Sequence, residues 1–202
     1  RYNRLGENVM RIIAGKYKAK VINSPKTEKT RPTLDRVKEA MFSILIPYIL
    51  DANVLDLFSG TGNLGLESIS RGAKFAWLND SSNIAISTII SNVELTNAKT
   101  CVKITKKDYI KCLRQIQNQN MYFDIIFLDP PYDSKFAIET LKYISENKNI
   151  LAKDGIIVYE TDKNYMTKLE KKGIELADEF SNLECIDNRN YGNVVLKFFK
   201  WR

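Results

Sequence analysis

Short apolar runs alternate with amphipathic stretches from residue 53 onward. The apolar runs predict strands over 53–58, 74–79, 100–105, 123–129 and 155–160. The stretches between and after them predict helices over 63–71, 83–97, 108–118, 135–150 and 163–172. This order is typical of a parallel sheet with helices on both faces.

The last part of the chain has a different pattern. The β-rich run 194–201 and a strand near 176–180 or 183–189 predict a closing antiparallel hairpin. The residues 189–192, Arg-Asn-Tyr-Gly, supply turn chemistry between them. We therefore expect an α/β fold with a doubly wound, mostly parallel, seven-stranded sheet that ends in a C-terminal antiparallel hairpin.

The first 45 residues differ from the rest. Residues 11–25 alternate like a strand, with Gly15 as a turn and Pro25 as a stop, and a helix with one apolar face is predicted to begin near Thr33. We expect residues 1–45 to form a basic extension, a β-hairpin plus a lead-in helix, and residues 46–202 to form the main domain.

The distribution of charged residues supports this division of the chain into an extension and a main domain. The net charge is +7, and residues 1–40 hold eleven Lys or Arg against four acids, whereas residues 41–202 hold 20 of each. A basic arm on a neutral body is the expected footprint of a phosphate-backbone contact. The longest apolar stretch, 40–50, is broken by Ser43 and Pro47 and is too short to cross a bilayer. Without a secretory pattern at the N-terminus, we expect a cytoplasmic protein with no membrane contact.

The cysteine and histidine content excludes several classes of metal site and catalytic nucleophile. The three cysteines show no C-x-x-C spacing, and the chain has no histidine. This argues against a zinc ribbon, a His-based metal site and a Ser-His-Asp or Cys-His nucleophile. We expect no metal, and whatever reaction occurs must proceed without imidazole.

A glycine-rich turn, Ser-Gly-Thr-Gly-Asn-Leu-Gly at 59–65, follows the first predicted strand. Gly60, Gly62 and Gly65 fit the G-x-G-x-x-G template of dinucleotide sites, and Asp80 lies about twenty residues further on. Asp80 could bind the ribose hydroxyls of a dinucleotide or those of S-adenosylmethionine, so it does not distinguish the two ligands. Asp56 does distinguish these ligands. Its negative charge would repel a pyrophosphate bound to the loop amides but would attract the cationic groups of S-adenosylmethionine.

A second motif, Asp129-Pro130-Pro131-Tyr132, follows the apolar run 123–128. Two prolines remove backbone donors and stiffen the chain, which leaves carbonyl oxygens and the Asp129 carboxylate as acceptors. Tyr132 adds a flat ring for stacking. Such a cluster fits a flipped-out nucleobase whose exocyclic amine donates two hydrogen bonds.

Together these stretches carry a family resemblance. Residues 54–80 and 124–132 are similar to class I S-adenosylmethionine-dependent methyltransferases, with a Rossmann-like fold, that act on exocyclic amines. Residues 10–18 and 30–45 narrow the resemblance to the RsmD family of bacterial 16S ribosomal RNA guanine-N2 methyltransferases. The resemblance extends from Met10 to the tail, and in this family guanine 966 is the expected target.

The resemblance implies roles for particular residues. The target amine would meet the catalytic residues Asp129, Pro130, Pro131 and Tyr132. The cofactor would contact Asp56, Ser59, Gly60, Thr61, Gly62, Gly65, Asp80, Asp108 and Asp129. The RNA would contact Lys16, Lys18, Arg31, Thr33, Arg36 and Tyr132. Ser59 and Thr61 stand where alanine and serine are more usual in the family, and Asp80 replaces a common glutamate.

The family resemblance also implies ribosomal RNA as the partner, in a small subunit or its assembly intermediate, and we expect the chain to be a monomer. Four alternatives remain at this level. They are a DNA adenine-N6 or cytosine-N4 methyltransferase, a glutamine or small-molecule N-methyltransferase, a non-catalytic RNA-binding assembly factor and a nicotinamide oxidoreductase. Residues 1–9 precede the family's usual start and have no assigned function.

Overall fold

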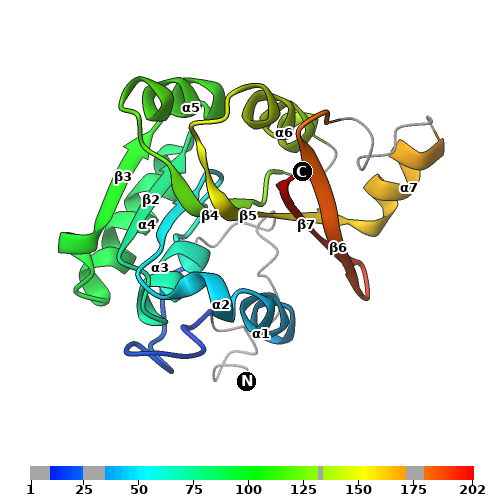
Figure 1. Cartoon of the computed structure of the whole chain (residues 1–202). Helices are drawn as coiled ribbons and strands as arrows, with labels where there is room; N and C mark the ends of the chain where they lie inside the picture. Colours follow the sequence, from blue (N-terminus) through cyan, green and yellow to red (C-terminus); the bar gives the residue numbers. More distant parts are fainter. Residues whose placement is uncertain (1–9, 25–34, 132–133, 172–179) are drawn as a thin grey trace.

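A seven-stranded sheet forms the centre of the computed structural model, which describes residues 10–24, 35–131, 134–171 and 180–202 (Figure 1). The strands lie in the order β3-β2-β1-β4-β5-β7-β6. Neighbours from β3 to β5 pair in parallel, and β7 pairs antiparallel with both β5 and β6. The strands are β1 Asn53–Asp56, β2 Phe75–Asp80, β3 Val102–Lys106, β4 Phe123–Leu128, β5 Leu151–Asp162, β6 Leu183–Tyr191 and β7 Val194–Trp201.

Helices cover both faces of this sheet. In Figure 1, α1 to α4 lie on one side and α5 and α6 on the other. Each face has its own apolar core, and alternate residues of β1 enter the two cores, Val54 on the α1–α4 side and Leu55 on the α5–α7 side. The helices are α1 Asp35–Ile44, α2 Ile46–Ile49, α3 Asn63–Ser70, α4 Asn83–Leu95, α5 Tyr109–Asn118, α6 Phe136–Glu146 and α7 Lys163–Lys171, with a 3-10 turn at Lys99–Cys101.

The predicted fold class is confirmed, including the closing hairpin, whose first strand is β6 rather than 176–180. Every predicted strand and helix from residue 53 onward is present, with shifted ends. The first strand stops at Asp56 rather than at 58, because the chain already turns there, and β5 is longer than predicted because its ends pair with β4 and β7. The predicted strand 176–180 and the start of the first helix at Thr33 lie largely outside the described residues.

The basic N-terminal segment forms a minimal hairpin rather than two regular strands. One antiparallel bridge joins Arg11 and Val21, and Ile22 donates a backbone hydrogen bond to Met10. Gly15 turns the segment with a φ of +80°, and an added Cβ there would lie 1.8 Å from the Ser70 carbonyl oxygen. The segment therefore lies directly against the end of α3, and the buried Ile12 and Ile22 belong to the same core as α1. The division at residues 45 and 46 stays a prediction.

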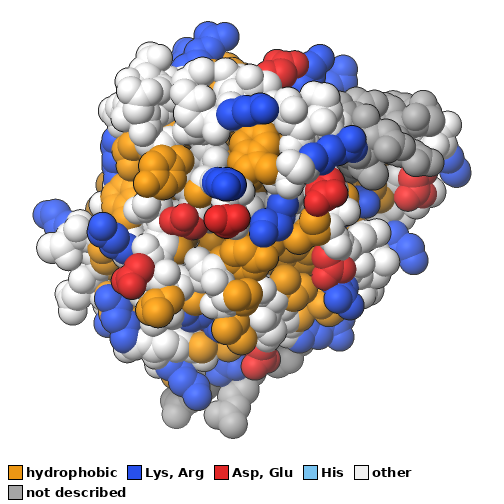
Figure 2. All heavy atoms as spheres, viewed as in Figure 1, with side chains coloured by type: hydrophobic (Ala, Val, Ile, Leu, Met, Phe, Trp, Pro, Cys, Tyr) orange, Lys and Arg blue, Asp and Glu red, His pale blue; other side chains and the backbone are white. Residues whose placement is uncertain are grey.

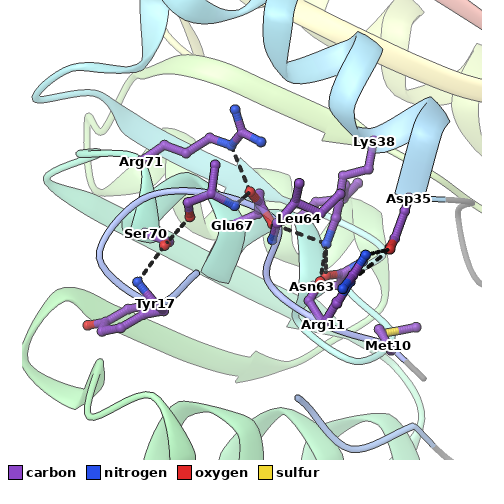
Figure 3. A network of polar contacts seen from close by, with 12 residues as sticks. Met10, Arg11, Tyr17, Asp35, Lys38, Asn63, Leu64, Glu67, Ser70 and Arg71 are labelled. Atoms are coloured by element: carbon purple, nitrogen blue, oxygen red, sulfur yellow. Dashed lines mark hydrogen bonds and ion pairs between the residues drawn. The ribbon is translucent and has the colours of Figure 1, made fainter. Parts of the chain in front are cut away.

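A buried carboxylate fastens this segment to α3 (Figure 3). Glu67 is fully buried, and its Oε2 and Oε1 accept hydrogen bonds from the amides of Ile13 at 2.7 Å and Ala14 at 3.0 Å. Arg71 also donates to Oε1, at 2.7 Å. A side chain on α3 thus replaces the strand partner that the N-terminal segment lacks.

The same carboxylate pairs with a buried ammonium on α1. Lys38 Nζ lies 3.1 Å from Glu67 Oε2 and donates to the Arg11 carbonyl oxygen at 2.6 Å. The Lys38 side chain is only 1% exposed. Three separate parts of the chain, the N-terminal segment, α1 and α3, therefore meet at one ion pair.

We predict that Glu67→Ala lowers the free energy of unfolding by about 3–5 kcal/mol, because it leaves the buried Lys38 ammonium without its counter-charge and the amides of Ile13 and Ala14 without their acceptor. The control is Asp35→Ala, which breaks the half-exposed pair between Asp35 and Arg11 at 2.9 Å. That variant should lose about 1 kcal/mol or less. If denaturant unfolding gave both variants the same loss in free energy of unfolding, the buried pair would stabilise the fold no more than the half-exposed pair does.

Candidate active site

The carboxyl ends of the parallel strands open on a cavity of about 520 Å³. In an open parallel sheet this edge is where ligands bind, outside the point at which the strand order reverses. Here that point lies between β1 and β4. The walls are Met10, Asp56–Thr61, Asn63, Leu64, Asn79–Ser81, Lys107–Tyr109, Asp129–Pro131 and Phe136.

The glycine loop shapes one wall. Gly60 has a φ of +55°, and an added Cβ would meet nothing within 4 Å, so the backbone is open to the cavity at this point. Gly62 has a φ of +80° and forms the N-cap of α3. An added Cβ on Gly65 would lie 2.1 Å from Leu78 Cδ2. Gly62 and Gly65 are therefore needed for the turn and its packing, and only Gly60 lines the cavity.

Asp56 ends β1 and is 1% exposed. Its Oδ2 accepts hydrogen bonds from Ser59 Oγ at 2.9 Å and from the Gly65 amide at 3.2 Å. Burial raises the pKa of Asp56 to about 7, and the nearby Asp80 carboxylate acts in the same direction. The predicted Asp56 and Ser59 thus meet in one contact that also closes the glycine loop.

Asp80 ends β2 and connects the loops after β1 and β2. Its Oδ2 accepts from the Gly60 amide at 2.9 Å, and its Oδ1 accepts from the Ser82 amide at 2.8 Å. The preceding residue, Asn79, is buried and donates from Nδ2 to the carbonyl oxygens of Leu57 at 3.1 Å and Lys107 at 3.0 Å. These contacts set the spacing of three strand-end loops around the cavity.

The far wall is aromatic. Asp108 caps α5 through the Ile110 amide, which places Tyr109 in the wall. The Tyr109 ring lies 5.6 Å from that of Phe58 and 4.9 Å from that of Phe136, and its hydroxyl donates to Glu139. A flat apolar wall next to the acid Asp108 can hold a purine ring.

Asp129, Pro130 and Pro131 follow β4 and line the same cavity. Asp129 is partly exposed there, and Pro130 is buried. Burial raises the pKa of Asp129 well above its usual range, and the negative charges of Glu160 and Asp56 add to the effect. Tyr132 lies outside the described residues.

The residues expected to contact RNA lie in different places. Lys16 and Lys18 are exposed near the C-terminal end of α3, where the Lys16 amide donates to the Ser70 carbonyl oxygen. The cavity is at the other end of this helix. Arg36 is exposed on α1, close to the turn between β6 and β7 at Gly192. Arg31 and Thr33 lie outside the described residues.

Surface charge on the face seen in Figure 2 is mixed. Lys and Arg side chains are scattered across it together with Asp and Glu, and hydrophobic side chains lie between them. This view shows no single basic patch among the coloured residues. Whether Lys16, Lys18 and Arg36 contact RNA stays a prediction.

Sequence reasoning missed several wall residues. Met10 accepts a hydrogen bond at its sulfur from Thr61 Oγ1 at 3.1 Å, so the N-terminal segment lies across the glycine loop. Asn63 and Asn79 each follow or precede a predicted site residue in the sequence, and this proximity is the one signal that could have identified them as wall residues. The aromatic wall has no local motif, because Phe58 comes from the loop after β1, Tyr109 from the start of α5 and Phe136 from the start of α6.

Within the described parts of the chain, no group of three or more His, Cys, Asp or Glu side chains is placed to hold a metal ion. A search of the same residues for a helix with the length and hydropathy of a membrane span finds none.

Known proteins share both the sequence and the fold. The "Putative rRNA methyltransferase YlbH" of Bacillus subtilis is 31% identical over 193 residues, which cover 96% of this chain and all of that protein. The "Ribosomal RNA small subunit methyltransferase D" of Haemophilus influenzae is 35% identical over 156 residues, 77% of this chain and 80% of that one. The solved structure of the "Putative methyltransferase yhhF from Escherichia coli" is 26% identical, with a TM-score of 0.78 over 96% of this chain and 99% of that one.

A family model described as "Conserved hypothetical protein 95" matches residues 10–200. Its span is nearly the one over which the sequence motifs resemble RsmD proteins, and the fold is that of class I methyltransferases. The chain belongs to this family, the RsmD family of methyltransferases.

Proposed function

We propose that this chain transfers a methyl group from S-adenosylmethionine to the exocyclic N2 of a guanine in small-subunit ribosomal RNA, with guanine 966 of 16S RNA as the expected position. The observation that carries the proposal is the shared cavity. Asp129, Pro130 and Pro131 open on the same space as the glycine loop and Asp80. The acceptors for a target amine therefore stand beside the groups for a nucleoside cofactor.

The donor set of the cavity fits S-adenosylmethionine. The open backbone at Gly60 leaves room for close approach, Asp80 is placed to accept from the ribose hydroxyls, and the aromatic wall with Asp108 suits the adenine. The buried Asp56 suits a cation rather than a pyrophosphate. When bound, this cofactor supplies an electrophilic methyl group on a sulfonium.

The chain's own residues orient the amine. The lone pair of an aryl amine is delocalised into the ring, so the amine is a poor nucleophile. Acceptors at Asp129 and the Pro130 carbonyl oxygen would hold its two protons and turn the lone pair toward the methyl group. This is catalysis by orientation and electrostatics, and it needs no histidine. The raised pKa of Asp129 also suits a late acceptor of the released proton.

The names of the relatives support RNA as the substrate. Proteins that match most of this chain are named for ribosomal RNA methylation. A DNA methyltransferase with the same tetrapeptide usually needs a separate target-recognition region, whereas the residues that the structure describes form the sheet, its helices and a short N-terminal hairpin. Because the basic residues on the face seen in Figure 2 are scattered, we further propose that folded RNA or ribosomal proteins present the target guanine.

The test of the proposed function is transfer of tritiated methyl from S-adenosylmethionine to small ribosomal subunits that lack this modification. After nuclease digestion, the label should appear in N2-methylguanosine, and free RNA should accept less label than assembled particles. Label in another nucleoside would reject the target atom. Label on DNA alone, or no label despite cofactor binding, would favour the DNA enzyme or the assembly factor.

Asp129→Ala should keep cofactor affinity and lower the turnover number by about 100-fold or more, because it removes an acceptor that orients the amine. Asp154→Ala is a matched control, since Asp154 is exposed near the start of the neighbouring strand β5. Its turnover number should be unchanged. If Asp129→Ala weakened cofactor binding as much as turnover, the role in orienting the amine would be wrong.

Asp56→Asn should stabilise the free protein more at pH 8 than at pH 5. The pKa of Asp56 is about 7 in the folded chain against an ordinary value of 3.8, so its ionisation weakens the folded state as pH rises through this window. Asparagine cannot ionise, and its oxygen can still accept from Ser59 and Gly65. Denaturant unfolding of both proteins at the two pH values measures the difference, and a gap independent of pH would contradict it.

A further inference from the structure

Asn63 lies at the junction of the cavity and the buried ion pair. It is the first residue of α3, is 7% exposed and lines the cavity. Its side-chain oxygen Oδ1 faces Lys38 Nζ at 2.7 Å (Figure 3). An ammonium group has hydrogens to donate and no lone pair to offer, so the amide must turn its oxygen toward Lys38 and its NH2 group away.

The orientation of this amide is fixed by the surroundings of Lys38. The three hydrogens of the ammonium have three acceptors, the Arg11 carbonyl oxygen at 2.6 Å, Asn63 Oδ1 at 2.7 Å and Glu67 Oε2 at 3.1 Å. Rotating the Asn63 amide by half a turn would place NH2 against NH3⁺ in a buried site. Such a contact loses a hydrogen bond and adds repulsion.

The NH2 group of Asn63 is left without a partner in the described part of the chain. Nδ2 donates none of the side-chain hydrogen bonds found among these residues, although the residue is almost fully buried. An amide donor that lines a cavity and has no partner among the described residues is available to a ligand that occupies the cavity. The adjacent wall residue Met10 is held over the loop by Thr61, which encloses this corner of the cavity.

The charge beneath this corner favours an anion. Lys38 and Arg71 are both paired with the single carboxylate of Glu67, so two cations balance one anion. The acid Asp56, in contrast, lines the same cavity. The two sides suit a zwitterion, with its ammonium toward Asp56 and its carboxylate toward Asn63.

We propose that Asn63 Nδ2 binds the carboxylate of the amino-acid end of the methyl donor, and that Lys38 is the positioning residue that fixes the Asn63 amide for this task. This inference rests on the proposed function, because it assigns a contact to the same cofactor. The inference explains why the buried Lys38 on α1 donates a hydrogen bond to Asn63 in the glycine loop. It also makes recognition of the cofactor's carboxylate depend on the docking of α1.

The test compares two ligands in calorimetric titrations, S-adenosylhomocysteine and its decarboxylated analogue, which keeps the ammonium and lacks the carboxylate. Asn63→Asp retains an acceptor for Lys38 and replaces the NH2 donor by a carboxylate oxygen. It should weaken binding of S-adenosylhomocysteine at least about tenfold, since a charge-assisted hydrogen bond becomes a repulsion. The decarboxylated analogue should bind Asn63→Asp as tightly as wild type or more tightly.

Two further variants separate binding from folding. Asn63→Ala should weaken S-adenosylhomocysteine alone, and Lys38→Met should lower the ratio of the two affinities even where its melting temperature falls. Equal weakening of both ligands in Asn63→Asp, or no weakening of either, would overturn the role of Asn63 and leave the proposed function standing. Failure of the wild-type chain to bind S-adenosylhomocysteine would instead reject the proposed function itself.

Discussion

The ion pair between Lys38 and Glu67 is the interaction on which the rest of the site depends. Both side chains are almost completely buried, and neither charge has access to water that could replace its partner. The pair is satisfied only when the N-terminal segment, α1 and α3 are in place together, because each of them supplies donors or acceptors to it. Since α3 begins at the glycine loop, the position of that loop is linked to the docking of a segment almost fifty residues earlier in the chain.

The parallel register supplies the second constraint. It brings the ends of β1, β2 and β4 to one edge, so that Asp56, Asp80 and Asp129 line one cavity. The three carboxylates differ in the hydrogen-bond donors and charges that surround them. Asp80 accepts from two backbone amides, Asp56 is buried with two donors, and Asp129 is partly exposed at the cavity, close to the acids Glu160 and Asp56. No side-chain hydrogen bond to Asp129 is found among the described residues, and Asp129 is the acceptor that we propose for a substrate amine, whereas Asp56 and Asp80 also hold the loops around the cavity.

The fold from residue 53 onward could be predicted because each strand and helix has a clear local period. The acids at the strand ends could be predicted as well, since any parallel sheet gathers them at one edge. The aromatic wall could not, because Phe58, Tyr109 and Phe136 meet only through tertiary packing. Lys38 shows the same limit. In the sequence it is one more positive charge of a basic arm, and only the packing of α1 on α3 turns it inward, whereas Lys16 and Lys18 of the same arm remain in solvent at the far end of α3.

We propose that this glycine loop and its acids hold a sulfonium nucleoside rather than a dinucleotide. Parallel calorimetric titrations of the full chain with S-adenosylhomocysteine and with NAD, combined with hydrogen exchange at the loop amides, test it most directly. We predict one molecule of S-adenosylhomocysteine bound per chain, slower exchange at Gly60 and Gly62, and no binding of NAD. Binding of NAD with protection of the same amides, and none of S-adenosylhomocysteine, would contradict it.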